Sequence, residues 1–241
     1  MIKQKQMKIP RYTQIAGYLR AKLEAGDWPV GTCMPAIDQL AENFEVAPQT
    51  MRQSLIVLEG EGLIQRKQGV GTIVLASPRE QRWLKLPTDW ETLVNMLSEL
   101  EVRRLVLEDS EKAPTLNAEE GEPCAAYKFL KRVHYRKNEP FCVLEAYLSA
   151  EIYIQSPMEF RTNIIIPHLA NRTGVEIGTV KQNLRVDVAD ADIAKHLDIP
   201  LAGPVVKVRR IITDKNGAVI YMANVAYRGD VVTLEMDLSP K

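Results

Sequence analysis

Four consecutive residues, Arg66, Lys67, Gln68 and Gly69, combine two cations and an amide with a glycine, and Gly71 follows two positions later. Glycine adopts tight turns and admits close approach by a second backbone. Cations beside such a turn can contact phosphate oxygens or enter a minor groove. The run therefore predicts the tip of a hairpin that touches a nucleic acid.

A second polar set, Gln49, Thr50 and Arg52, follows Pro48, and proline is favoured at the first position of a helix. The first turns of a recognition helix reach base edges and phosphates. Glutamine pairs with adenine there, arginine with guanine or phosphate, and a threonine hydroxyl with a phosphate oxygen. For each residue taken alone, the alternative is an ordinary solvent-exposed helix face.

Three predicted helices must position these two sets. Apolar residues at helical spacing predict a first helix from Tyr12 to near Gly26, a second after Pro35 and a third from Pro48. Their inward-facing residues are expected to be Ile15, Ala16, Leu19, Leu23, Ile37, Leu40, Ala41, Phe44, Met51, Leu55, Val57 and Leu58. Three helices followed by a basic hairpin are the layout of a winged helix-turn-helix domain.

This part of the chain resembles the GntR family of bacterial transcription regulators. The likeness rests on Tyr12-Thr13-Gln14-Ile15-Ala16, Leu40-Ala41, Thr50-Met51-Arg52, Glu61-Gly62-Leu63-Ile64 and Gln68-Gly69-Val70-Gly71-Thr72, and it runs over residues 12–74 without a gap. The resemblance implies DNA contacts at Asp38, Ala47, Pro48, Gln49, Thr50, Arg52, Gln68 and Gly69.

The chain departs from the family pattern at the start of two helices. The family usually has Ser-Glu-Arg where this chain has Ala36-Ile37-Asp38, and Ser-Arg where it has Ala47-Pro48. Two customary arginines are absent, and a carboxylate at Asp38 would repel phosphate. Base reading is therefore expected from Gln49, Arg52 and the hairpin. The cations expected to support it are Arg66, Lys67 and the N-terminal Lys3, Lys5 and Lys8, unless that N-terminal arm is a disordered tail.

Charge and hydropathy limit the class of protein. Residues 1–77 contain nine Lys and Arg against seven Asp and Glu, so no strong positive field covers the first domain. No apolar run approaches the ~20 residues that cross a bilayer, and the start lacks a secretory hydrophobic region. A cytoplasmic location is expected.

The cysteines and histidines predict neither a disulfide nor a metal site. Cys33, Cys124 and Cys142 are odd in number and lack CxxC spacing, so reduced core thiols are expected. His168 and His196 are expected on helix surfaces, although Asp192 and His196 share a helix face and form the alternative metal pair. We expect no cofactor.

The domain division predicted from these patterns is a winged domain in residues 1–76, a linker in 77–89 and a second domain in 90–241. The linker is marked by Ser77-Pro78, charges and Pro87. The second domain should open with a helix carrying Leu93, Val94, Leu97 and Leu100, followed by strands 125–135 and 141–147, helices 163–171 and 190–197, and strands 205–213 and 218–227. Turns at 136–140 and 214–217 make two hairpins, which indicates an α+β fold with an antiparallel sheet.

The second domain resembles the UTRA effector domain of HutC-type GntR regulators. The likeness rests on Arg132-Val133-His134, Asn138-Glu139-Pro140, Glu145-Ala146-Tyr147-Leu148, Leu197-Asp198-Ile199-Pro200 and Tyr227-Arg228-Gly229-Asp230. It implies a fold like that of chorismate lyase, a small molecule bound in a cleft beside the sheet, and dimerisation through the C-terminal half. The implied effector contacts are Arg132, His134, Glu145, Tyr221 and Tyr227.

These effector positions favour an organic acid. Arg132 can clamp a carboxylate or phosphate, whereas His134 stands where a second arginine is common and so disfavours a phosphate dianion. Glu145 can accept from hydroxyls or an amine, and the tyrosines suit a ring. The alternative is a cross-strand ion pair between Arg132 and Glu145, with Tyr147 and the other tyrosines in the core. Arg228 and Asp230 are expected to hold the strand end.

The combined patterns predict a homodimeric, ligand-responsive repressor that binds a short inverted-repeat operator. One alternative is a chorismate-lyase-like enzyme that acts on an aromatic acid, although the sequence shows no nucleophile and base pair, metal spacing or phosphate loop. The other is a ligand-independent DNA-binding regulator whose second domain only dimerises.

Overall fold

The computed structural model of the chain describes every residue except 1–9, 79–81, 173, 238 and 240–241. The expected lysines at the N-terminus, Lys3, Lys5 and Lys8, lie outside the described residues. The chain forms two compact units, Met1–Trp83 and Leu84–Lys241, and the division falls between residues 77 and 89.

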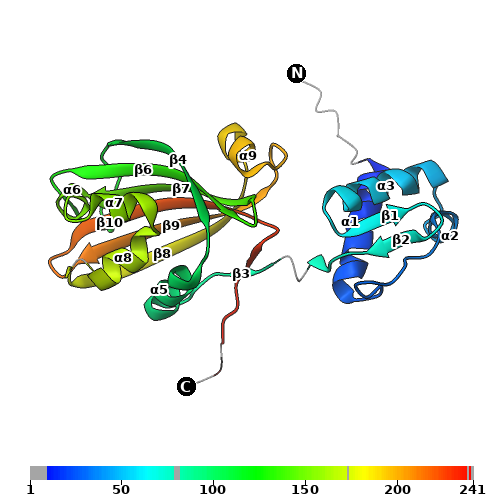
Figure 1. Cartoon of the computed structure of the whole chain (residues 1–241), viewed down its shortest axis with the longest axis horizontal. Helices are drawn as coiled ribbons and strands as arrows, with labels where there is room; N and C mark the ends of the chain where they lie inside the picture. Colours follow the sequence, from blue (N-terminus) through cyan, green and yellow to red (C-terminus); the bar gives the residue numbers. More distant parts are fainter. Residues whose placement is uncertain (1–9, 79–81, 173, 238, 240–241) are drawn as a thin grey trace. The chain divides into compact units, whose positions relative to one another are not determined.

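The described part of the first unit forms helices followed by a hairpin (Figure 1). They are α1 (Arg11–Ala25), α2 (Ile37–Asn43), α3 (Pro48–Gly60), β1 (Ile64–Lys67) and β2 (Gly71–Val74), which confirms the winged helix-turn-helix prediction. Leu19, Leu55 and Leu58 form the centre of its core, while Val57 is half-buried. Helix α1 ends as expected at Gly26, whose φ of 87° lies in the left-handed region that glycine tolerates.

The N-termini of these three helices share an unusual property. Their N-cap residues are Pro10, Ala36 and Ala47, and none supplies a side-chain hydrogen bond to the helix. In α3, Pro48 occupies the first turn, as the sequence predicts. The first N–H groups of α2 and α3 are therefore not satisfied by a capping side chain.

The second unit is built on an antiparallel sheet with the strand order β4-β6-β7-β10-β9-β8, and β5 pairs in parallel with β10. This arrangement confirms the predicted α+β class. Its elements are β3 (Leu84–Lys85), α5 (Trp90–Glu99), β4 (Arg103–Glu111), β5 (Glu122–Pro123), β6 (Tyr127–Arg136), β7 (Glu139–Ser149), α6 (Ala150–Tyr153), α7 (Pro157–Thr162), α8 (Ile165–Arg172), β8 (Ile177–Val188), α9 (Ala191–Leu197), β9 (Pro204–Asp214), β10 (Ala218–Arg228) and β11 (Val232–Thr233).

The two predicted hairpins are present, with tighter turns than expected. Lys137 and Asn138 have φ values of 47° and 67°, so β6 and β7 are joined by a two-residue turn rather than by residues 136–140. Between β9 and β10, Asp214 Oδ1 accepts hydrogen bonds from the amides of Asn216 and Ala218, and Gly217 has a φ of 87°.

Two sequence expectations about burial are wrong. His168 is 8% exposed, because its ring packs edge-on against Phe160 of α7 with the ring centroids 4.7 Å apart. Cys33 is exposed in the segment between α1 and α2, where it forms an isolated β-bridge with Ile73, whereas Cys124 is half-buried and Cys142 is buried; all three are free thiols.

Candidate functional site

The recognition-helix residues lie at the surface. Gln49 and Arg52 are exposed near the start of α3, and Thr50 is half-buried. No ion-pair partner for Arg52 is found among the described residues. Asp38 is exposed in the first turn of α2, so its carboxylate adds a negative charge to this unit's surface.

The hairpin tip has the conformation that its glycines predict. Gly69 and Gly71 have φ values of 77° and 111°, and Lys67 and Gln68 are exposed beside them. Lys67 likewise has no ion-pair partner within the described part of the chain. The tip therefore presents the Lys67 cation, the Gln68 amide and two glycines to solvent.

Arg66 differs from its neighbour because its guanidinium is already bound. Its Nε donates to Glu59 Oε2 at 2.8 Å, its Nη2 donates to the same oxygen at 2.5 Å, and its backbone N–H donates to Glu59 Oε1 at 2.9 Å. The pKa of Glu59 is lowered, chiefly by the backbone hydrogen bond from Arg66. Arg66 thus ties the wing to α3, and its DNA contact stays a prediction.

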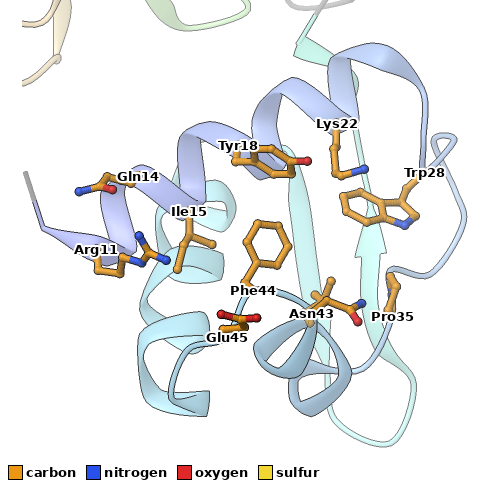
Figure 2. Close-up of a pocket in the computed structure, with 11 residues that line it drawn as sticks. Arg11, Gln14, Ile15, Tyr18, Lys22, Trp28, Pro35, Asn43, Phe44 and Glu45 are labelled. Atoms are coloured by element: carbon orange, nitrogen blue, oxygen red, sulfur yellow. The ribbon is translucent and has the colours of Figure 1, made fainter.

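A groove of about 560 Å³ separates α1 from α2 in the same unit (Figure 2). Tyr18 and Phe44 meet edge to face with ring centroids 5.2 Å apart, and the Lys22 ammonium lies 5.8 Å from the centroid of Trp28. The sequence patterns did not predict it. Its lining excludes Gln49, Arg52 and Lys67, so the groove is distinct from the predicted DNA-facing set.

In the second unit, strand register decides which candidate residues share a face. His134 lies opposite Cys142, and Cys142 lies opposite Tyr227. Side chains directly opposite in an antiparallel ladder point to the same side. His134, Tyr221 and Tyr227 all line a cavity of about 40 Å³, to which α5 and the start of α8 also contribute lining residues. Its other lining residues are Leu84, Met96, Leu97, Leu100, Phe141, Cys142, Leu144, Ile164, Ile165, Ile166, Arg210 and Val225.

Arg132 lies on the same face as His134 but does not line the cavity. Its Nη1 donates to the carbonyl of Asn163 at 3.1 Å, and its Nη2 donates to the carbonyl of Phe160. Burial lowers the pKa of Arg132 to about 10, so the side chain remains a cation at neutral pH. In this conformation Arg132 holds the end of α7, and its Nε has no partner among the described residues.

Glu145 does not join the other candidates. It lies opposite Lys131, one residue from Arg132, and consecutive strand residues point to opposite faces. Its carboxylate pairs with Lys131 Nζ at 3.0 Å, and the same ammonium reaches Asp192 at 2.8 Å. The alternative of an Arg132–Glu145 ion pair is therefore wrong. Leu144, not Glu145, lies opposite Arg132 and lines the cavity.

The sequence patterns missed Arg210. This side chain is 3% exposed, lines the cavity and donates from Nε and Nη2 to Gln182 Oε1 at 3.1 and 2.6 Å. A neutral amide, rather than a carboxylate, is thus its hydrogen-bonding partner. The signal was present in the predicted hairpin, because its register places Arg210 opposite Ala223, on the face of Tyr221 and Tyr227.

The residues that line the cavity include a positive charge but no carboxylate. Burial lowers the pKa of His134 to about 3, so the imidazole is neutral, and its Nε2 has no partner among the described residues. Burial raises the pKa of Tyr221 to about 12 and also raises that of Tyr227. Arg210 is the cation among the cavity-lining residues, and none of them is a carboxylic acid. An anion would therefore meet one positive charge and neutral hydrogen-bond donors.

Two further predicted groups are placed by direct contacts. Arg228 pairs with Asp230 at 2.5 Å and donates from Nη1 to the carbonyl of Pro140 at 3.4 Å, so it holds the end of β10. His196 Nε2 lies 3.4 Å from Asp192 Oδ1. Within the described residues, no group of three or more His, Cys, Asp or Glu side chains is arranged to hold a metal ion.

Comparison with known families agrees with both units. Residues 11–74 match the family described as "Bacterial regulatory proteins, gntR family", and residues 94–233 match the "UTRA domain". The chain belongs to the GntR family. Its winged unit is the GntR DNA-binding domain, and its second unit is a UTRA domain.

Relatives of similar length share both domains. The chain is 28% identical over 233 residues to the HTH-type transcriptional repressor NagR of Bacillus subtilis, covering 95% of each chain. It is 26% identical over 205 residues to the probable transcriptional regulator PhnF of Escherichia coli, covering 83% of each. The crystal structure of PhnF from Mycobacterium smegmatis has a TM-score of 0.54 at 21% identity, covering 94% of this chain and 100% of that one. The structure of the possible regulator YydK of Bacillus subtilis has a TM-score of 0.53 at 22% identity, covering 95% and 99%.

This GntR protein is a transcription regulator and not an enzyme, so the lyase alternative is set aside. None of the helices in the described residues has both the length and the apolar composition needed to cross a membrane.

Proposed function

We propose that this GntR protein is a repressor that binds an inverted-repeat operator as a homodimer in the cytoplasm and that a small organic acid in the UTRA domain controls its DNA affinity. The observation that carries the ligand proposal is the buried Arg210, which faces a cavity with an amide and no carboxylate as its partner. Buried charges are costly without a counter-charge, so an anionic ligand would supply what the protein lacks.

The DNA contacts are proposed for the exposed polar residues of α3 and the wing. Arg52 and Lys67 are the main cations, because neither is bound to a carboxylate in the described structure. Arg66 contributes less, because its guanidinium is engaged with Glu59. The remaining proposed contacts are Gln49, Thr50, Gln68 and Gly69.

The ligand is proposed to have a largely apolar body and one anionic head. The head would bind Arg210, with hydroxyls from Tyr221 and Tyr227 and the unpartnered Nε2 of His134 as further polar contacts. Leu144 and Val225 offer no group for a hydroxyl-rich ligand. Arg132 is not proposed as a ligand contact, because it holds the end of α7 beside the cavity. Glu145 lies on the opposite face of the sheet and is not proposed as a contact either.

Ligand entry must change the fold locally. A cavity of about 40 Å³ has room for roughly one water molecule, so α5 or the start of α8 has to move. Leu84 of β3 and Leu97 of α5 line the cavity just after the chain leaves the winged unit. A displacement there would reach the connecting segment, and a coupling of ~1–3 kcal/mol would suffice for control.

The DNA proposal is tested by selecting an operator from random duplexes and measuring Kd for Arg52→Ala beside Arg161→Ala. Arg161 is a half-exposed arginine of α7 in the UTRA domain, so it controls for loss of one positive charge. We expect Arg52→Ala to weaken binding by about ten- to a hundredfold and Arg161→Ala to have no effect. Equal losses would contradict the assignment of α3.

The ligand proposal is tested by a thermal-shift screen of aliphatic and aromatic carboxylates against sugar phosphates. A ligand that binds the native state raises Tm by mass action. We expect hits among apolar carboxylates, lost in Arg210→Gln and retained in Arg161→Ala. Hits confined to sugar phosphates would contradict the ligand class, and a blank screen with intact operator binding would favour the ligand-independent regulator.

A further inference from the structure

The side chain of Gln182 bridges a residue of the UTRA cavity and the segment that enters the domain. Gln182 lies on β8 opposite Arg210, and its Oε1 accepts hydrogen bonds from Nε and Nη2 of that arginine at 3.1 and 2.6 Å. Its Nε2 donates to the carbonyl oxygen of Pro87 at 3.4 Å. One amide therefore contacts both the cavity-lining cation and the backbone between β3 and α5.

The chemistry of the two partners fixes the orientation of this amide. A guanidinium has only donors, and a backbone carbonyl has only acceptors. Arg210 must therefore meet the amide oxygen of Gln182, and the Pro87 carbonyl must meet the amide NH₂ group. If Arg210 turned to another acceptor, Gln182 would lose the partner that holds its amide in this orientation.

The backbone next to Pro87 is positioned by a short parallel ladder. Strands β3 and β11 pair over two residues, and the amides of Leu84 and Leu86 each donate to a carbonyl of residues 231–233 at 2.9 Å. Leu84 also lines the cavity, as do residues of α5. Because a ladder of this length contributes few hydrogen bonds, one further bond at Pro87 forms a substantial part of what positions the segment.

We propose that Gln182 is a positioning residue that transmits ligand binding from Arg210 to the segment at Pro87. This inference rests on the proposed function, because it requires an anionic group at Arg210. A carboxylate presents two charged oxygens to a guanidinium, and such bidentate pairs are stronger than hydrogen bonds to a neutral amide oxygen. The anionic head of the ligand therefore takes Arg210 from Gln182.

Release of Gln182 then loosens the segment. Gln182 is an exposed residue, so an amide without Arg210 turns to water and no longer has a fixed bond to Pro87. The ligand binds the released arrangement better than the bridged one, because only in the released arrangement does Arg210 have no competing acceptor. A ligand changes the populations of two arrangements by this difference in affinity.

Two substitutions of Gln182 separate its contacts. Gln182→Met keeps an unbranched side chain but has neither an acceptor for Arg210 nor a donor for Pro87. Gln182→Glu supplies a carboxylate that stays paired with Arg210, and it also lacks the donor for Pro87. Gln155, an exposed glutamine just beyond α6, receives the same two changes as the matched control.

Hydrogen exchange of the full-length, ligand-free proteins tests the bond to Pro87. Both Gln182 variants should raise exchange at the Leu84 and Leu86 amides by about two- to tenfold, the value of one neutral hydrogen bond. Both Gln155 variants should leave these amides unchanged. Unchanged exchange in Gln182→Met would overturn the proposed role of Gln182, whatever binds in the cavity.

Binding of octanoate, measured by isothermal titration calorimetry, tests the competition at Arg210. Gln182→Met removes the competing acceptor, so it should bind octanoate about two- to tenfold more tightly than wild type. Gln182→Glu should weaken binding by at least that factor, because its carboxylate already occupies Arg210. A merely structural role would move both variants in the same direction, and that result would overturn the proposal.

The proposed function is tested separately by Arg210→Gln. Octanoate that binds Arg210→Gln as tightly as wild type would contradict the proposed contact with Arg210, whatever the Gln182 variants do. If wild type binds no octanoate, the competition step is overturned together with the proposed ligand class. The exchange measurements then still decide whether Gln182 holds the segment at Pro87.

Discussion

At the scale of single residues, burial sets the chemistry of the UTRA cavity. His134 sits on β6 with its Nε2 unpartnered, and burial holds its pKa at about 3, against 6.5 for an exposed imidazole. The folded state therefore binds no proton at His134 until the solution is strongly acidic, whereas the unfolded chain binds one below pH 6.5. Folding stability should consequently depend on pH through this residue.

The sign of that dependence is fixed by linkage. Between pH 6.5 and pH 3 the unfolded state carries the extra proton, so the free energy of unfolding rises with pH and falls on acidification. His134→Gln should reduce this slope by up to about 1.4 kcal/mol per pH unit. Denaturant titrations from pH 7.5 to pH 4.5 measure this slope for the wild type and for His134→Gln. The reference is pH 7.5, where residue 134 is uncharged in both proteins. An unchanged slope would show that His134 is not held neutral.

Arg66 and Glu59 carry a second residue-level prediction. Each side chain is about one-third exposed, so their ion pair contributes less than about 1 kcal/mol to stability. Glu59→Gln should release the guanidinium toward phosphate and steepen the dependence of log Kd on log salt by about 0.9, the value for one added phosphate contact. Fluorescence anisotropy across a salt series measures the slope. A flatter slope than wild type would mean that Arg66 serves only the wing.

The sequence motifs named candidate residues for the cavity, but they did not show which face of the sheet each residue occupies. Arg132, His134 and Tyr227 were named from their motifs and lie on one face of the sheet, whereas Glu145, which was named with them, lies on the other face. A shift of one residue in a strand moves a side chain to the other side of the sheet. Arg210 was not predicted because the sequence does not show which of the neighbouring Arg209 and Arg210 faces the cavity. Strand register decides this: Arg210 faces the cavity, and Arg209 binds Glu120 at 2.6 Å.

At the scale of elements, the helices and hairpins with strong local signals were predictable. Helix α9 begins after the N-cap Asp190 and the hairpin turn contains Gly217, as the sequence indicates. Strand β8 was missed because it is an edge strand whose polar residues face solvent, so it lacks the continuous apolar run of β7. Its β character arises from pairing with β9, a long-range contact that local patterns do not contain.

The uncapped start of α3 gives an element-level prediction. Ala47 already has the extended conformation of an N-cap residue, with φ −62° and ψ 142°, but has no side-chain acceptor. Ala47→Ser should raise the free energy of unfolding of the winged unit by about 1 kcal/mol, measured by denaturant titration. Ala21→Ser, in the exposed middle of α1, is the control and should lower it by a few tenths. Destabilisation by both variants would show that the N–H groups of α3 are satisfied otherwise.

At the scale of the whole molecule, we expect charge and domain structure together to determine the affinity for the proposed operator. The chain contains 31 Lys and Arg and 31 Asp and Glu, so its overall field gives little non-specific attraction to DNA. Within the described residues, one winged unit offers few cations without an ion-pair partner, Arg52 and Lys67 among them. High affinity should therefore require two winged units on one operator, joined through the UTRA domains.

That requirement predicts a difference between full-length protein and a fragment of residues 1–83, which form one compact unit. Linking two binding units makes the second contact intramolecular and raises affinity by about 10²- to 10⁴-fold. We expect this gain on a duplex with two half-sites and none on a duplex with one. Gel-shift titrations of both proteins on both duplexes measure it, with circular dichroism to show that the fragment is folded. If the folded fragment bound the two-site duplex as tightly as the full-length chain, affinity would come from each winged unit alone and the dimer would have no part in operator recognition.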